Sequence, residues 1–148
     1  MFKHILVATD GSELADKAVE EGLALAKALK AKATAVTVTE PWDPLSMAAI
    51  AEAQVRNPIA NYEERMAAAA DRILQSAAEK AKKLDVACAT VHVSDRHPAE
   101  GIIEAAQVHM CDLIVMASHG RRGLARLLLG SQANKVLTLS PVPVLICR

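Results

Sequence analysis

Five short apolar runs alternate with longer segments of helical periodicity, and this alternation constrains the fold more than any other feature. The first run, HILVATD at 4–10, is almost entirely apolar up to its end at Asp10-Gly11-Ser12. A near-continuous apolar run that ends in turn residues is typical of a strand buried on both faces of a parallel sheet. Four further runs are predicted as strands: ATAVTVTE (33–40), VACATVHV (86–93), CDLIVMAS (111–118) and PVPVLICR (141–148).

The segments between these runs have helical patterns. Ser12 is a suitable N-cap for the first helix, and a long helix is predicted over about 60–84. His97-Pro98 introduces a third helix, since proline suits the first helical turn. A last helix is predicted from the glycines near 130 to about Leu139. The segment 45–58 has the weakest pattern, and its LSMAAIAEAQVR is compatible with a short helix.

Helices between consecutive buried strands predict right-handed crossovers and a sheet covered on both faces. We therefore expect a single α/β domain over residues 1–148, an open five-stranded parallel sheet of the Rossmann-like kind. A chain of 148 residues is long enough to bury a core without metals or disulfides.

Composition argues against several classes of function. The 17 basic and 17 acidic side chains cancel, and aromatic residues make up 2% of the chain, so we expect no nucleic-acid binding. No apolar run approaches the roughly 20 residues that span a bilayer, and the N-terminal apolar stretch is too short for a signal peptide. We expect no membrane association. The three cysteines form no CxxC pair and are expected to be buried free thiols in a reducing cytosol: Cys88, Cys111 and Cys147.

Chemistry is expected at the ends of the first and fourth strands. ATDGS (8–12) places a carboxylate and a hydroxyl after one buried strand, and ASHGRRG (117–123) places glycines and arginines after the other. In open parallel sheets, ligands bind beyond the carboxyl ends of strands where the strand order reverses. If the two strands are neighbours, their loops form one cleft. The glycines and the helix start at Gly130-Ser131 then suit a phosphate, although two ordinary turns explain the same residues.

These residues resemble the universal stress protein family over the whole chain. ATP-binding members of that family carry Gly-x-x-Gly, nine residues, then Gly-Ser or Gly-Thr. The corresponding pattern here is Ala117-Ser118-His119-Gly120, nine residues (121–129), then Gly130-Ser131. The resemblance implies the adenine nucleotide alpha hydrolase-like variant of the fold and ATP as the ligand, with Mg²⁺ as a possible companion of the triphosphate.

The resemblance also implies roles for particular residues. Asp10 would lie near the ribose and phosphates, and Val38 would meet the adenine through its backbone. The outer phosphates would take amides from Gly130, Ser131 and Gln132. The remaining residues would line the nucleotide: Ala8, Thr9, Met116, Ala117 and Gly120. Each has an ordinary alternative, since Val38 and Met116 also suit a core and Asp10 also suits a helix cap.

One residue departs from the family motif. Ala117 replaces the first glycine and adds one methyl group, which would be excluded only if the position needs a positive φ. This departure keeps a second function open, that of an interaction module that binds no nucleotide. A slow nucleotide hydrolase is the third.

We expect no catalytic residues and no metal site formed by protein ligands alone. Ser118 and His119 are adjacent on a predicted strand, so their side chains should point to opposite faces and not pair, and the chain has no GxSxG. His92 and His97 lack companion ligands at metal-binding spacing. Any ATP hydrolysis is expected to be slow, because no base and charge clamp can be identified.

The expected function is that of a cytoplasmic stress-response protein that binds ATP and acts on unidentified protein partners as a signalling module. The resemblance also implies a homodimer, formed by symmetric pairing of the last strand along residues 142–147. Pro141 and Pro143 leave only part of that edge free for such pairing.

Overall fold

All five predicted apolar runs form strands of one sheet. The computed structural model describes residues 1–43, 45, 56–120 and 128–148. Its sheet has the order β3-β2-β1-β4-β5, with each neighbouring pair parallel. The strands are β1 (His4–Ala8), β2 (Lys32–Thr39), β3 (Cys88–Ser94), β4 (Leu113–Ala117) and β5 (Val144–Cys147).

The strand order reverses at β1, so the first and fourth strands are neighbours, which is the condition for their loops to form one cleft. The chain moves from β1 outward through β2 to β3, then returns to the other side of β1 for β4 and β5. Leu6 is paired with Thr34 of β2 on one side and with Ile114 of β4 on the other. The carboxyl ends of β1 and β4 therefore lie side by side at the switch point, where ligands bind in sheets of this kind.

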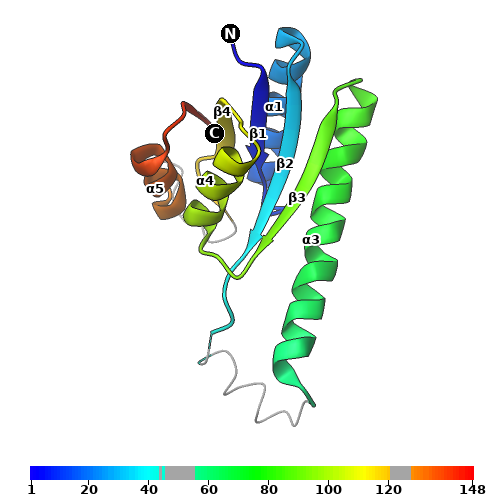
Figure 1. Cartoon of the computed structure of the whole chain (residues 1–148), viewed down its shortest axis with the longest axis vertical. Coiled ribbons are helices and arrows are strands. Elements are labelled where there is room, and N and C mark those ends of the chain that lie inside the picture. The colour runs from blue at the N-terminus through cyan, green and yellow to red at the C-terminus, as the bar shows by residue number, and fades with distance from the viewer. Residues whose placement is uncertain (44, 46–55, 121–127) are drawn as a thin grey trace.

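Helices cover both faces of the sheet (Figure 1), as predicted. Two lie on one face and two on the other: α1 (Glu13–Leu29) with α3 (Pro58–Lys83), and α4 (Pro98–Val108) with α5 (Ser131–Leu139). The first half of α3 runs beyond the strand ends (Figure 1). No helix in the described ranges combines the length and apolarity that a bilayer crossing needs.

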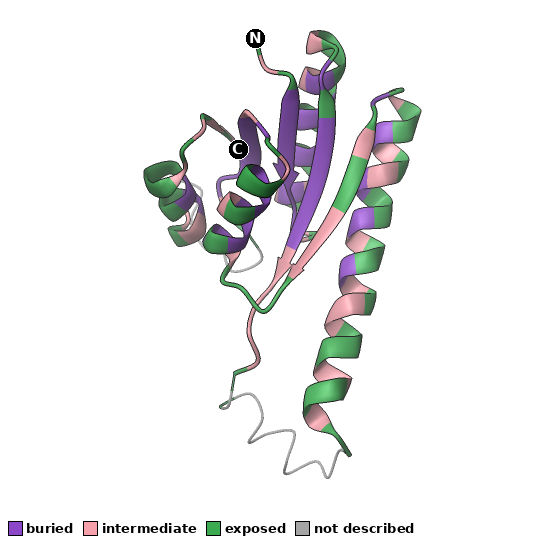
Figure 2. Ribbon diagram, viewed as in Figure 1, coloured by how far each residue is buried: buried purple, intermediate pink, exposed green. Residues whose placement is uncertain are grey.

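Alternating residues of β1 divide the core in two. Ile5 and Val7 pack under α1 and α3, whereas Leu6 and Ala8 pack under α4 and α5. Figure 2 shows the consequence: the central strands β1 and β4 are buried along their length, while β3 at the edge has only half-buried and exposed residues. This two-sided burial explains why the central strands read as uninterrupted apolar runs.

Element boundaries differ from the predicted ones by a few residues. β5 begins at Val144 because Pro141 and Pro143 precede it and cannot donate to a ladder. β4 ends at Ala117, one residue before the predicted end. Ser12 caps α1 as predicted, accepting a hydrogen bond from the Ala15 amide at 3.2 Å. The short helix predicted within 45–58 falls almost entirely outside the described residues.

The expected free thiols are present, and two are buried. Cys111 and Cys147 are buried, whereas Cys88 is only half-buried. Burial raises the pKa of Cys111 to about 11 and, together with Glu21, raises that of Cys147 to about 12. Both thiols are therefore protonated at neutral pH and are poor nucleophiles.

Three helices end in the same way without glycine. After α1, α3 and α4, the next-but-one amide reaches back to a carbonyl near the helix end, as in a Schellman motif. The bonds are Ala31 to Ala26 (2.9 Å), Val86 to Ala81 (3.0 Å) and Cys111 to Ala106 (2.8 Å). The left-handed position is taken by Lys30, Asp85 and Met110, whose φ values are 55°, 57° and 53°. An L-residue in this conformation is strained, so each of these three residues lowers the stability of the fold, and a substitution by glycine can relieve the strain.

Met110→Gly should raise the free energy of unfolding by roughly 0.5–1 kcal/mol, because glycine removes the left-handed strain at the cost of some chain entropy. Met110 is 82% exposed, so little apolar burial is lost. Urea unfolding measures the change. Val108→Gly, inside the last turn of α4, is the control and should destabilise; a loss of stability in Met110→Gly would contradict the assignment.

Candidate functional site

A cavity of about 710 Å³ lies at the carboxyl ends of β1, β2 and β4. Its volume is within the range of ligand sites, roughly 300–1,000 Å³. All ten residues selected from the sequence line it: Ala8, Thr9, Asp10, Val38, Met116, Ala117, Gly120, Gly130, Ser131 and Gln132. The end of β1, the end of β4, the start of α5 and one residue of β2 thus line a single cavity. This is the cleft that was expected from the sequence for neighbouring strands.

The β1 and β4 loops touch at Asp10 and Gly120. A β-carbon at Gly120 would lie 2.6 Å from Oδ2 of Asp10, which is closer than such atoms approach. The other carboxylate oxygen of Asp10 accepts a hydrogen bond from the Ser12 amide at 2.9 Å. The absence of a side chain at Gly120 therefore makes room for the Asp10 carboxylate. The turn before α1 holds that carboxylate at the cavity wall.

Gly130 joins the start of α5 to the end of β4. Its amide donates to the Ser118 carbonyl at 2.8 Å, and a β-carbon at Gly130 would meet that same oxygen at 2.8 Å. This bond corrects one expectation: the Gly130 amide is already used within the protein and is not offered to a phosphate. The amides at the first positions of α5, Ser131 and Gln132, have no acceptor within the helix.

The amino end of α5 presents an uncompensated positive dipole. Gly130 is its N-cap, makes no side-chain cap, and no acidic residue lies in the first turn. By contrast, the first turn of α1 contains Glu13 and Asp16. Of these two helix starts at the cavity edge, only that of α5 retains the field that attracts an anion. The Gln132 side chain is occupied, since its Oε1 accepts the Ala99 amide at 3.1 Å.

Ser118 and His119 contradict the prediction that they cannot pair. Ser118 Oγ lies 3.0 Å from His119 Nδ1. The alternation argument fails because β4 ends at Ala117 and the chain bends at Ser118, so the two residues no longer share an extended backbone. The pair lines the cavity beside Gly130.

Ala117 has the ordinary backbone of a strand. It lies in β4 and is not among the described residues with positive φ. Its side chain packs with the core under α1. The one condition under which alanine would be excluded from the motif position is therefore absent.

Much of the cavity wall was not predicted. It comes from the end of β2, from α3 and from α4, and includes Thr37, Thr39, Glu40, Tyr62, Met66, Ala69, Ile73, Pro98 and Ile102. Tyr62 donates its hydroxyl to the Glu40 carbonyl at 3.1 Å, which ties α3 to the end of β2. Burial and the Glu40 charge raise the pKa of Tyr62, so it stays a neutral donor. Tyr62 is the only tyrosine in the chain and could have been noticed for that reason. It lies more than fifty residues before the glycine motif in the sequence, so nothing in the sequence linked it to the site.

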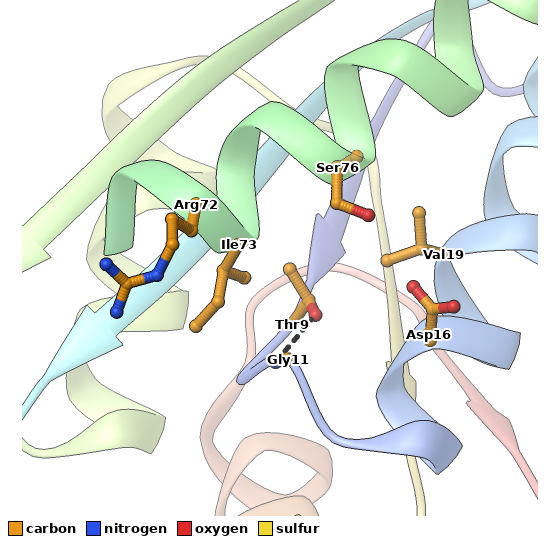
Figure 3. A pocket seen from close by; sticks show the side chains of 8 residues that line it. Thr9, Gly11, Asp16, Val19, Arg72, Ile73 and Ser76 are labelled. Atoms are coloured by element: carbon orange, nitrogen blue, oxygen red, sulfur yellow. Dashed lines mark hydrogen bonds between the residues drawn. The ribbon is translucent and has the colours of Figure 1, made fainter. Parts of the chain in front are cut away.

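A smaller cavity of about 220 Å³ lies between α1 and α3 (Figure 3). It shares Thr9 and Ile73 with the large cavity. Thr9 Oγ1 accepts the Gly11 amide at 3.1 Å, and Asp16 forms an ion pair with Lys80 that joins the two helices. Within the described ranges, no group of three His, Cys, Asp or Glu side chains is arranged to hold a metal.

Comparison with known proteins gives the family. The model of the Universal stress protein family matches residues 1–148. The chain belongs to the universal stress protein family. This confirms the resemblance drawn from the glycine motif and the strand order.

Relatives match over the full length of this universal stress protein. Universal stress protein YxiE of Bacillus subtilis is 32% identical over 149 residues, with all of both chains covered. A universal stress protein of Thermus aquaticus is 33% identical over 148 residues, again over all of both chains. The solved structure of a universal stress protein in complex with cAMP has a TM-score of 0.74 and 26% identity, covering 99% of this chain and 97% of that one.

The two site glycines should respond differently to alanine. Gly130→Ala should lower the free energy of unfolding by about 1–3 kcal/mol, since its methyl meets a backbone carbonyl that is fixed in the β4 turn. Gly120→Ala should cost less, because its methyl meets the end of the Asp10 side chain, which shifts more easily than a backbone carbonyl. Denaturant titration of both variants measures this order; equal or reversed costs would contradict the close approach at Gly130.

Proposed function

We propose that this chain is a single universal-stress-protein domain that binds an adenine nucleotide, with ATP as its ligand. The amino end of α5 carries this proposal, since it aims open amides and an uncompensated dipole into a cavity of about 710 Å³. The relative solved in complex with cAMP supports an adenine nucleotide as the ligand class.

In this proposal the phosphates lie at α5. The amides of Ser131 and Gln132, with the Ser131 hydroxyl, bind the outer phosphates. Asp10 accepts hydrogen bonds from the ribose or shares an accompanying Mg²⁺ with the phosphates. The adenine lies at the end of β2, where the Val38 backbone meets its edge. The rest of the wall excludes water from the nucleotide: Ala8, Thr9, Met116, Ala117 and Gly120.

We further propose a cytoplasmic signalling role, in which nucleotide occupancy changes the surface offered to protein partners. Three free cysteines support a reducing compartment. The competing function, an interaction module without nucleotide, rested on Ala117. Ala117 lies in β4 without a positive φ, which supports the nucleotide-binding function over that module.

Ser131→Asp should weaken ATP binding at least about tenfold. A carboxylate at the first position of α5 suits the helix dipole, so the fold is kept, but it repels the phosphates at short range. Isothermal titration of ATP and of adenosine measures the effect, after nucleotide retained through purification has been identified by mass spectrometry. Adenosine, which lacks phosphate, should bind both proteins alike.

Thr138→Glu is the matched control. It adds the same charge to α5 but in its last turn, where Thr138 is exposed. Its affinity for ATP should match that of the wild type. Equal weakening in both variants would mean that net charge, and not the start of α5, governs binding; no ATP binding by the wild type would end the proposal.

We also propose a homodimer through β5, along residues 142–147. β5 is an edge strand, and Leu145 is 41% exposed on it. An apolar edge with free main-chain groups favours pairing with a second copy about a two-fold axis.

Leu145→Lys should convert the dimer to a monomer, because a charge on an edge strand opposes pairing. Light scattering gives the mass in solution. Thr90→Lys, an exposed site on the opposite edge strand β3, should leave the dimer intact. A wild type that is monomeric at micromolar concentration would contradict the proposal.

A further inference from the structure

The imidazole of His119 is held in a fixed orientation at the phosphate end of the cavity. Ser118 is buried, with 5% of its surface exposed, and its Oγ lies 3.0 Å from Nδ1 of His119. The Ser118 backbone is itself fixed on both sides. Its amide donates to the Cys147 carbonyl of β5 and its carbonyl accepts from the Gly130 amide, both at 2.8 Å. The serine thus anchors one ring nitrogen from a rigid position.

The other edge of the ring faces the start of α5. Cδ2 of His119 would lie 3.5 Å from a β-carbon at Gly130, the N-cap of that helix. Cδ2 is bonded to Nε2, so the ring nitrogen that Ser118 does not use belongs to the edge nearest the α5 amides. A phosphate bound to the amides of Ser131 and Gln132 would come within reach of Nε2.

We propose that His119 is a direct ligand of the outermost phosphate, positioned by Ser118, and that nucleotide binding therefore takes up a proton. This inference rests on the proposed nucleotide site. A phosphate dianion beside Nε2 favours the charged form of the ring, because an opposite charge within a few ångströms stabilises the imidazolium. The charged ring then donates a hydrogen bond that is stronger than a neutral one.

Few charges in the described part of the chain oppose this mechanism. The β1 loop contributes Asp10, whose carboxylate is packed against Gly120, the residue after His119. The first turn of α5 contributes no acidic residue, and β5 contributes only the Cys147 carbonyl at the Ser118 amide. Three arginines follow in sequence, at positions 121, 122 and 126. These groups are present with and without nucleotide, so the change in charge on binding comes from the phosphate.

Calorimetric titration of ATP at pH 7.5, in buffers of different ionisation enthalpy, counts the protons taken up. This pH lies above the second pKa of a terminal phosphate, about 6, so the ligand itself binds few further protons. The wild type should take up a substantial fraction of one proton with ATP and none with adenosine. Its affinity for ATP should increase as the pH falls from 8 to 7.

His119→Gln keeps a neutral donor near the Nε2 position and should abolish the uptake while weakening ATP binding about fivefold. Ser118→Ala frees the ring and should weaken binding while keeping part of the uptake. His109→Gln, at the carboxyl end of α4, is the matched control and should behave as wild type. Proton uptake that is unchanged in His119→Gln, with ATP still bound, would overturn this inference alone. Absence of ATP binding in the wild type would instead overturn the proposed function and this inference with it.

Discussion

The parallel pairing of β1 with β4 is the constraint on which the rest of the site depends. It places the loop after Ala8 and the loop after Ala117 at the same edge of the sheet, where the strand order reverses. The two strands pair in one register, with Ile5 opposite Leu113 and Val7 opposite Val115, so the two loops are held at a fixed separation. That separation is short enough for Asp10 to lie against Gly120.

A second consequence is that backbone, more than side chains, builds the proposed phosphate end. The Ser118 carbonyl fixes the amide of Gly130, and this bond sets where α5 begins. The helix start then directs its remaining amides and its dipole into the cavity without an acidic side chain to cancel them. Because the positive charge is spread over the helix end, the proposed phosphate binding depends on how α5 is oriented toward the cavity. Glycine at 130 permits that orientation, since it lets the helix start lie close to the Ser118 carbonyl.

The sequence predicted the strands and the helices well, because each rests on local periodicity. It predicted one cleft between the β1 and β4 loops only on the condition that the two strands are neighbours, which the strand order meets. It did not predict the wall formed by Tyr62, Met66 and Ile73, since only packing of α3 over the strand ends brings those residues in. It was wrong about Ser118 and His119, because the strand ends one residue earlier than the apolar run. It also missed the use of the Gly130 amide, which depends on a contact across twelve residues. The left-handed residues that end three helices could not be predicted either, because none of them is a glycine.

The most direct test of the account is a nuclear magnetic resonance titration of the ¹⁵N-labelled protein with ATP and, separately, with adenosine. The account predicts that ATP shifts the amide signals of Ser131 and Gln132 strongly, while adenosine shifts signals around Val38 and leaves those two almost unchanged. Shifts produced by ATP that map to a different surface, with the α5 amides unaffected, would contradict it.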